Sequence, residues 1–308
     1  MEIVNMSKKK YNELTSLEID KSIINTEAKL LIAKLRNKDK VFKNLYRLNG
    51  PTFGNKLYTL ELLDTFKELL PHSFVLPDSL CAVQGQITGF SMDIIKGVPL
   101  SVILDNHKEN PELQIYYLKE VGKLLQQLES IREKTELDKI FINDLHSANF
   151  VVEHDTGELR TVDIDSCKIG DNKPFPSKYL SSRALLNNMI GKYTIYSKGV
   201  QLDGEPAKYD YRALFGYIDP DANSDAYCYI IMILNYLYGT NINNMDLEDF
   251  YSYLYYLEQI GLDHNLMDAF YKIVANCDNT IPVDELDTLT IEQVARAKHH
   301  VYSAVKGK

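Results

Sequence analysis

Acidic and amide side chains surround two short apolar runs in the segment FINDLHSANFVVEHDTGELRTVDIDS, residues 141–166. Asp144 and Asn149 precede the run that contains Val151, whereas Asp163 and Asp165 follow the run that ends at Val162. A carboxylate beside a buried strand is costly to desolvate unless a cation or hydrogen-bond donors accompany it. These side chains therefore either cap turns or hold a metal ion and take part in chemistry.

The elements that would position these residues follow from hydrophobic periodicity and turn residues. Within 141–166 we expect a strand, a turn at Asp155-Thr156-Gly157 and a second strand. In the first hundred residues the sequence predicts strands at 29–36 and 39–46, a helix at 55–70, and two strands within 80–95 joined at Gln84-Gly85-Gln86.

The remainder of the chain reads as mainly helical. An apolar stripe begins after Pro111 and predicts a long amphipathic helix. SDAYCYIIMILNYLYG, residues 224–239, is apolar on nearly every side after Asp225, which predicts a helix in the middle of a domain. Amphipathic helices are expected after Asp246, whereas 167–222 show no strong periodicity.

The motif NDLHSANFVV followed by TVDIDS resembles the catalytic loop and metal-binding strand end of the protein kinase-like superfamily. Asp144 and Asn149 keep the five-residue spacing of that pattern, and Asp163 ends the following strand. The resemblance implies that Asp144 orients an acceptor hydroxyl, and that Asn149 and Asp163 hold Mg²⁺ against the phosphates of ATP.

Further parts of the chain resemble other kinase elements in the same order. VFK (41–43) resembles the strand whose lysine contacts the α- and β-phosphates, and the helix after it carries Glu61, which would pair with that lysine. GFSMDIIKGVPL (89–100) resembles the hinge between two lobes. The nucleotide-binding residues implied are Lys43, Glu61, the gatekeeper Met92, and the adenine-contacting backbone of Asp93 and Ile95, while Asp225 would brace the catalytic loop.

The chain also departs from the protein kinase pattern. No glycine precedes Gly50, so a glycine-rich phosphate loop is absent. Ile142-Asn143 stand in place of His-Arg, and Asp-Ile-Asp replaces Asp-Phe-Gly. His146 occupies a position that is histidine in aminoglycoside- and choline-kinase-like enzymes. The resemblance is therefore to a divergent, bacterial or phage-like member of the superfamily.

Several residues have a second interpretation. Asp144 and Asn149 could simply cap a loop, since both residue types favour turns. Glu68 is a rival to Glu61 on the predicted helix, and His146 could be a structural hydrogen-bonding histidine rather than a phosphate contact. Asp165 is either a second metal ligand or a turn acid, and we favour the turn acid.

Composition excludes several classes of function. The formal net charge of −9 argues against nucleic acid as the main partner. Lys8-Lys9-Lys10 is the only dense basic run and reads as a solvated N-terminal tail. Four separated cysteines without a CxxC pair are expected to be reduced and mostly buried. With no signal peptide and no apolar stretch of membrane-spanning length, we expect a cytoplasmic protein.

Together these observations predict an α+β, two-lobed protein kinase-like fold. The small β-rich lobe would comprise 1–95 and the larger, mainly helical lobe 96–308, with a long activation-like segment at 163–225 and ATP and Mg²⁺ between the lobes. The expected activity is an ATP- and Mg²⁺-dependent phosphotransferase acting on Ser or Thr of a protein substrate. The alternatives are a small-molecule phosphotransferase and a catalytically weak pseudokinase that acts as a binding module.

Overall fold

The computed structural model describes residues 1–17, 28–35, 38–46, 48, 51–106, 108–174, 220–242, 247–275 and 280–306. It divides the chain into two compact units. The first unit comprises Met1–Leu100, Ile131–Ile142 and Ala148–Phe175. The second comprises Ser101–Ser130, Asn143–Ser147 and Pro176–Lys308. Their content of strands and helices confirms a mixed α+β protein.

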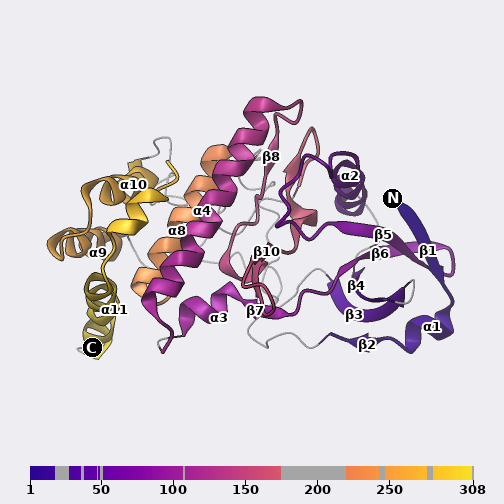
Figure 1. The fold of residues 1–308 in the computed structure, drawn as a ribbon, viewed down its shortest axis with the longest axis horizontal. Helices are drawn as coiled ribbons and strands as arrows, with labels where there is room; N and C mark the ends of the chain where they lie inside the picture. The colour runs from indigo at the N-terminus through magenta and orange to yellow at the C-terminus, as the bar shows by residue number, and fades with distance from the viewer. Residues whose placement is uncertain are drawn as a thin grey trace, which may run out of the picture. The chain divides into compact units, whose positions relative to one another are not determined.

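A six-stranded sheet forms the centre of the first unit (Figure 1). Its strand order is β1-β5-β6-β4-β3-β2, with every neighbouring pair antiparallel except β1 and β5. The strands are β1 (Glu2–Met6), β2 (Thr15–Ser16), β3 (Ala28–Leu35), β4 (Lys38–Leu45), β5 (Pro77–Val83) and β6 (Gln86–Asp93).

Two predicted hairpins are present in this sheet. β3 and β4 pair from Ala28↔Leu45 to Leu35↔Lys38, one residue earlier than the predicted strands, and their connecting residues lie outside the described part of the chain. β5 and β6 are joined by a turn in which Gln84 and Gly85 both have positive φ, of 53° and 84°. Two consecutive left-handed residues match the twist of antiparallel strands, which explains this tight connection.

The N-terminal residues are not the solvated tail that the sequence predicted. β1 pairs in parallel with β5, from Glu2↔Ser79 to Met6↔Val83. Helix α1 (Lys8–Asn12) follows, and the Ser7 side chain caps it by accepting a hydrogen bond from the Lys10 N–H at 3.2 Å. The lysine run is therefore helical, because the apolar residues around it, Met6 and Tyr11, pack on the core of the sheet.

Helix α2 (Pro51–Thr65) packs on this unit next to β5 and the short segments near residue 165. One face of the helix is buried and carries Lys56, Thr59, Leu60 and Leu63. The predicted helix at 55–70 is confirmed, but it begins four residues earlier and ends five residues earlier than predicted.

The segment that carries the sequence motif forms small sheets within the first unit. β9 (Phe150–Glu153) pairs with β10 (Leu159–Thr161) and with β7 (Gly97–Pro99), and β8 (Ile140–Phe141) pairs with β11 (Lys168–Ile169). The predicted strand–turn–strand is thus confirmed at β9–β10. These pairings join 148–175 to the first unit, so the observed division differs from the predicted one at 95/96.

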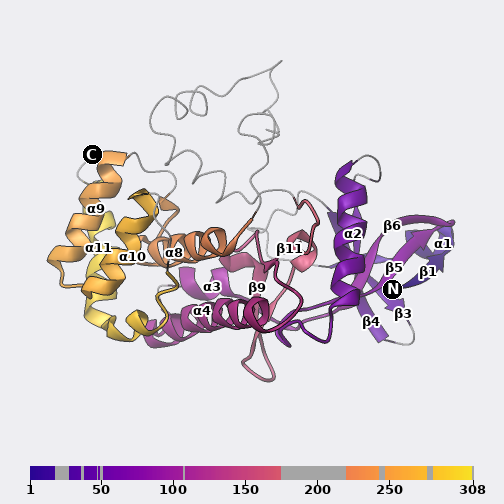
Figure 2. The same cartoon turned by 90° about the horizontal axis from the view of Figure 1, so that it is seen from above.

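The second unit is helical. It contains α3 (Leu100–Asp105), most of α4 (Pro111–Lys134), α8 (Ala222–Tyr238), α9 (Leu247–Gln259), α10 (His264–Ala275) and α11 (Ile291–Lys306). α8, α9, α10 and α11 lie together in both views (Figures 1 and 2). α10 contacts α9 and α8, and α11 contacts α8.

Helix α8 is the centre of this unit, as its apolar composition predicted. Thirteen of its residues are buried, from Ser224 to Leu237. A capping box between Asp221 and Ser224 starts the helix, and Gly239 ends it in the left-handed conformation with φ 77°. The Tyr229 hydroxyl donates a hydrogen bond to the Leu118 carbonyl of α4 at 2.9 Å, which satisfies a deeply buried polar group.

Three cysteines in the described residues, Cys81, Cys167 and Cys228, are buried thiols outside any disulfide, as predicted. Cys277 lies outside the described residues. Across the described part of the chain, no helix has both the length and the apolar character that crossing a membrane requires.

Gly89 on β6 is the most crowded glycine near Lys43. A Cβ at this position would lie 1.9 Å from the Lys43 carbonyl oxygen and 3.0 Å from the Phe42 ring. Gly89→Ala is therefore expected to push β4 and β6 apart and to lower the free energy of unfolding by about 1–3 kcal/mol.

The matched control is Gly54→Ala in α2, where a Cβ would meet nothing within 4 Å. This change is expected to leave stability unchanged or to raise it by up to about 1 kcal/mol, because alanine is the better helix former. Urea denaturation of both variants measures the difference. Equal stabilities for the two variants would show that Gly89 is not required for the contact between β4 and β6.

Candidate active site

Lys43 is a buried lysine on a central strand. Its side chain is 2% exposed, and its strand, β4, lies between β3 and β6. The ammonium lies 5.7 Å from the centre of the Phe90 ring. Phe90 is the residue of β6 that pairs with Lys43 of β4. A buried ammonium is stable only with anionic partners, and the structure supplies two of them.

The partners of Lys43 come from the Asp-Ile-Asp motif. Lys43 Nζ contacts Asp163 Oδ1, and it lies 2.9 Å from Asp165 Oδ1 and 3.1 Å from Asp165 Oδ2. Asp165 is 2% exposed, whereas Asp163 keeps 33% of its side-chain surface exposed. The two acids therefore share one cation but differ in their access to solvent.

A second lysine completes the group. Lys56 Nζ from α2 lies 2.8 Å from Asp165 Oδ2 and donates a hydrogen bond to Ser166 Oγ at 3.1 Å. Its side chain is 9% exposed. We call Lys43, Lys56, Asp163 and Asp165 the lysine–aspartate cluster. Two positive and two negative charges make the cluster neutral, which is the condition for burying it.

The cluster shifts the two carboxyl groups in opposite directions. Burial alone would raise the pKa of Asp165, but attraction to Lys43 and then to Lys56 holds this pKa well below its ordinary value. Burial raises the pKa of Asp163 above its ordinary value, and repulsion from Asp165 adds to the rise, which attraction to Lys43 only partly offsets. Asp165 therefore remains negatively charged. The positive charges near Asp163 do not fully compensate the negative charge of its carboxylate.

Backbone geometry brings Asn149 next to Asp163. The Asn149 carbonyl accepts a hydrogen bond from the Val162 N–H at 2.9 Å, which extends the pairing of β9 with β10. Asp163 follows directly and adopts φ 62° and ψ 27°, a left-handed conformation that costs a non-glycine residue energy. Such strain is concentrated at functional sites, where the surrounding structure maintains it.

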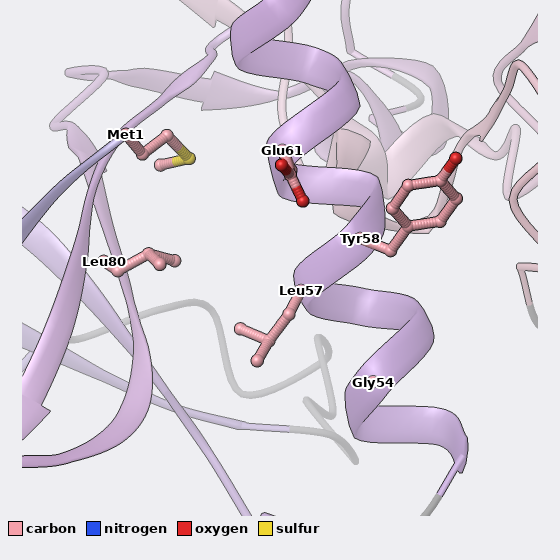
Figure 3. A pocket seen from close by; sticks show the side chains of 6 residues that line it. All are labelled: Met1, Gly54, Leu57, Tyr58, Glu61 and Leu80. Carbon is pink, nitrogen blue, oxygen red and sulfur yellow. The ribbon is translucent and has the colours of Figure 1, made fainter.

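Glu61 is not the partner of Lys43. It is exposed on α2 and lines a cavity of about 400 Å³ together with Met1, Gly54, Leu57, Tyr58 and Leu80 (Figure 3). The buried face of α2 instead presents Lys56 to Asp165. The predicted Lys43–Glu61 pair is therefore absent. Glu61 is one residue beyond the buried Leu60 and so lies on another side of the helix. Its rival Glu68 follows α2 and is also exposed.

The predicted hinge residues lie at the end of β6. Met92 is buried and pairs with Val41 of β4. Asp93 is the last residue of β6, and its exposed carboxylate lies 2.7 Å from Lys40 Nζ. Ile95 follows in an irregular stretch and is partly buried. Because β4 and β6 are neighbouring strands, Met92 and Asp93 pair with Val41 and Lys40, two and three residues before Lys43 on β4.

The residues around Asp144 belong to the second unit. The Asn143 N–H donates a hydrogen bond to Asp225 Oδ1 at 3.0 Å, which confirms the predicted brace from α8 to this loop. Asn143 has φ 64°, so the loop turns sharply just before Asp144. Asp144 is partly exposed, and its Oδ2 lies 3.6 Å from His146 Nε2.

The donor atoms on Asn149, Asp163 and Asp165 are carboxylate and amide oxygens, the type that Mg²⁺ prefers. Asp165 is almost fully buried and forms ion pairs with two lysines. Asp163 is partly exposed to solvent, and its negative charge is only partly compensated. Asp163 therefore fits an expected metal ligand better than Asp165 does, and Asn149 stays a predicted ligand. Among the described residues, no three His, Cys, Asp or Glu side chains gather in a way that would hold a metal ion by themselves.

Two residues of the cluster were missed or misjudged from the sequence. Asp165 was expected to be a turn acid, and Lys56 was not singled out. A signal for Lys56 was present, because it lies four and seven residues before the apolar positions Leu60 and Leu63 and so shares their helix face. Of the predicted activation-like segment, 175–219 lie outside the described residues.

Comparison of the sequence with protein-family models gave no match, and comparison with the curated proteins gave none either.

Asp225 is expected to stabilise the loop that carries Asp144. Asp225→Ala would leave the buried Asn143 N–H without its acceptor and should lower the free energy of unfolding by about 1–3 kcal/mol. Urea denaturation measures this change. As a control, the exposed Glu292→Ala in α11 should stay within about 0.5 kcal/mol of the wild type. A loss at Asp225 no larger than that of the control would refute its bracing role.

Proposed function

We propose that this protein is an ATP- and Mg²⁺-dependent phosphotransferase of the protein kinase-like superfamily, with a Ser or Thr hydroxyl of a protein as acceptor. The observation that carries the proposal is the burial of Lys43 against Asp163 and Asp165. A lysine on a sheet and two acids that follow a distant hairpin meet at one point, although 120 residues separate Lys43 from Asp163. Simple stability does not require such a cluster, because buried ion pairs contribute little net stability.

Each residue has a proposed role on the nucleotide side. Lys43 would contact the α- and β-phosphates, and Met92, Asp93 and Ile95 would line the adenine site. Asn149 and Asp163 would hold Mg²⁺, which supplies positive charge against the phosphate oxygens when bound. Asp163 suits this role because a third of its side chain is exposed and because the nearby Asp165 carboxylate competes with it for the positive charge of Lys43.

Asp144 is the proposed acceptor-side residue. Its carboxylate is partly exposed and sits in a loop whose backbone is fixed through Asn143 and Asp225. A fixed carboxylate can accept a hydrogen bond from a Ser or Thr hydroxyl and orient it for attack on the γ-phosphorus.

A small-molecule acceptor is the second candidate. His146 Nε2 lies 3.6 Å from Asp144 Oδ2, so the imidazole is next to the carboxylate that would bind the acceptor hydroxyl. In the sequence, histidine at this position is shared with aminoglycoside- and choline-kinase-like enzymes. A compact hydroxylated metabolite would satisfy the same Asp144 geometry as a protein hydroxyl.

Incubation with γ-labelled ATP and Mg²⁺ distinguishes these functions. The protein would be tested alone, with a generic Ser/Thr-containing protein acceptor, and with a mixture of amino alcohols and aminoglycosides. Label on protein supports the main proposal, and label only on a small molecule supports the second candidate. A folded protein that transfers no label under any of these conditions, and also fails to bind Mg²⁺-ATP in calorimetry, would contradict phosphotransfer.

Asp144→Asn is expected to separate chemistry from binding. The carboxylate acts mainly in the transition state, so kcat should fall by about 10²–10⁴-fold while the Kd for ATP changes little. Asp155→Asn, in the exposed turn between β9 and β10, is the matched control and should retain wild-type kcat. If the Asp144 variant keeps kcat within a few-fold of wild type, the catalytic role of this loop is wrong.

A further inference from the structure

The described contacts give the two acids of the Asp-Ile-Asp motif different environments. Asp165 is 2% exposed and accepts from both Lys43 and Lys56, at 2.9 Å and 2.8 Å. Asp163 is 33% exposed, and its Oδ1 contacts Lys43. An acid that is buried between two cations cannot exchange them easily, whereas an accessible acid can.

We infer that Asp165, fixed by Lys56 of α2, is the positioning residue for Lys43, in the place that the sequence assigned to Glu61. The inference rests on the proposed phosphotransferase function. The sequence predicted that α2 would contribute an acid, Glu61, to Lys43. In the structure α2 contributes Lys56, and the acid that holds Lys43 comes from the segment after β10.

The geometry supports this exchange of roles. Lys56 shares the buried face of α2 with Thr59. The same face is fixed by a second contact, because the Asn172 side-chain amide donates to Thr59 Oγ1 at 2.8 Å and to the Cys167 carbonyl at 2.9 Å. The helix is therefore attached at two points to the segment that follows Asp163, and one of these points is the Lys56–Asp165 pair.

Asp165 and Asp163 therefore have different roles. Asp165 keeps the Lys43 ammonium in place whether or not nucleotide and metal are present. Asp163 is the acid that can leave Lys43 and face a divalent cation. Loss of Asp165 should thus weaken phosphate binding with or without Mg²⁺, whereas loss of Asp163 should matter only when Mg²⁺ is present.

The first test needs no activity. Reductive methylation with formaldehyde and cyanoborohydride, followed by peptide mass spectrometry, measures how accessible each lysine is in the nucleotide-free protein. Asp165→Asn alone would leave an excess buried positive charge and could unfold the protein. The informative variant is therefore Asp165→Asn combined with Lys56→Met, which removes one charge of each sign and keeps the cluster neutral.

In this double variant Lys43 should be methylated at least about tenfold faster than in wild type, which corresponds to about 1.4 kcal/mol of opening free energy. Glu61→Gln should leave the rate at Lys43 unchanged. Lys168 is an internal reference for global unfolding, since it is buried and donates to the Asn172 carbonyl at 2.6 Å. The inference is overturned if Glu61→Gln, rather than the double variant, exposes Lys43 while Lys168 stays protected.

The second test measures ATP affinity by calorimetry, once in Mg²⁺ and once in EDTA. The double variant should lose at least about tenfold in affinity under both conditions, while Asp163→Asn should lose affinity only in Mg²⁺. Lys56→Arg should rescue most of the effect of Lys56→Met, with kcat affected less than KM for ATP. The exposed Lys67→Met is the control for loss of a lysine near α2.

The two tests separate the inference from the proposed function. If wild type binds no ATP, phosphotransfer fails, but the methylation rates still decide which acid holds Lys43. If ATP binds and Lys56→Met weakens binding without changing the methylation of Lys43, then Lys56 contacts the phosphates itself and the positioning role is wrong. Unchanged affinity and unchanged methylation in the double variant would also refute it.

Discussion

The buried ion pair between Lys43 and Asp165 is the constraint on which the arrangement of the first unit depends. A lysine on a central strand can be buried only if an anion comes with it, and leaving either charge without its partner would cost about 3–5 kcal/mol. This requirement brings the segment after β10 to β4. It also requires a second cation, because Asp163 and Asp165 together outweigh one lysine, and α2 supplies that cation as Lys56. β4, α2 and the segment after β10 therefore come together at the lysine–aspartate cluster, because its positive and negative charges must balance.

The same electrostatic balance gives Asp163 its chemical character. Burial opposes the charge of Asp165, but attraction to Lys43 and Lys56 lowers its pKa, while burial raises the pKa of Asp163. The left-handed backbone at Asp163 and the hydrogen bond from the Val162 N–H to the Asn149 carbonyl bring the backbones of Asp163 and Asn149 close together. A partly exposed carboxylate beside a buried lysine is suited to a divalent cation and a polyphosphate, which is the chemical basis of the proposed function.

Local patterns allowed most elements to be predicted, because alternating and helical periodicities reflect the burial of one face. The β3–β4 and β5–β6 hairpins, the long α4 and the mostly buried α8 follow from such patterns. The parallel pairing of β1 with β5 did not, since five residues beside a lysine run carry no signal for a distant partner. For the candidate site, order and spacing singled out Lys43 and Asp163, which are in contact in the structure, and Asp225 was singled out by its place on α8. Asn149 as a metal ligand stays a prediction. The assignment of Glu61 was wrong because it rested on chain order and on a place in the predicted helix, and did not ask which face of that helix is buried. The helix face shared by Lys56 and Leu60 contained the correct information, but the buried partner of Lys56, Asp165, is 109 positions away in the printed sequence.

The central claim is that Lys43 is the phosphate-contacting lysine of a nucleotide site. An acyl-phosphate derivative of ATP tests it directly, because this reagent transfers its acyl group to a lysine amine held beside the bound phosphates. Peptide mass spectrometry would identify the acylated residue with and without an excess of Mg²⁺-ATP. The account predicts acylation of Lys43, or of Lys43 together with Lys56, that Mg²⁺-ATP suppresses. Acylation confined to exposed lysines such as Lys67, unaffected by Mg²⁺-ATP, would contradict it.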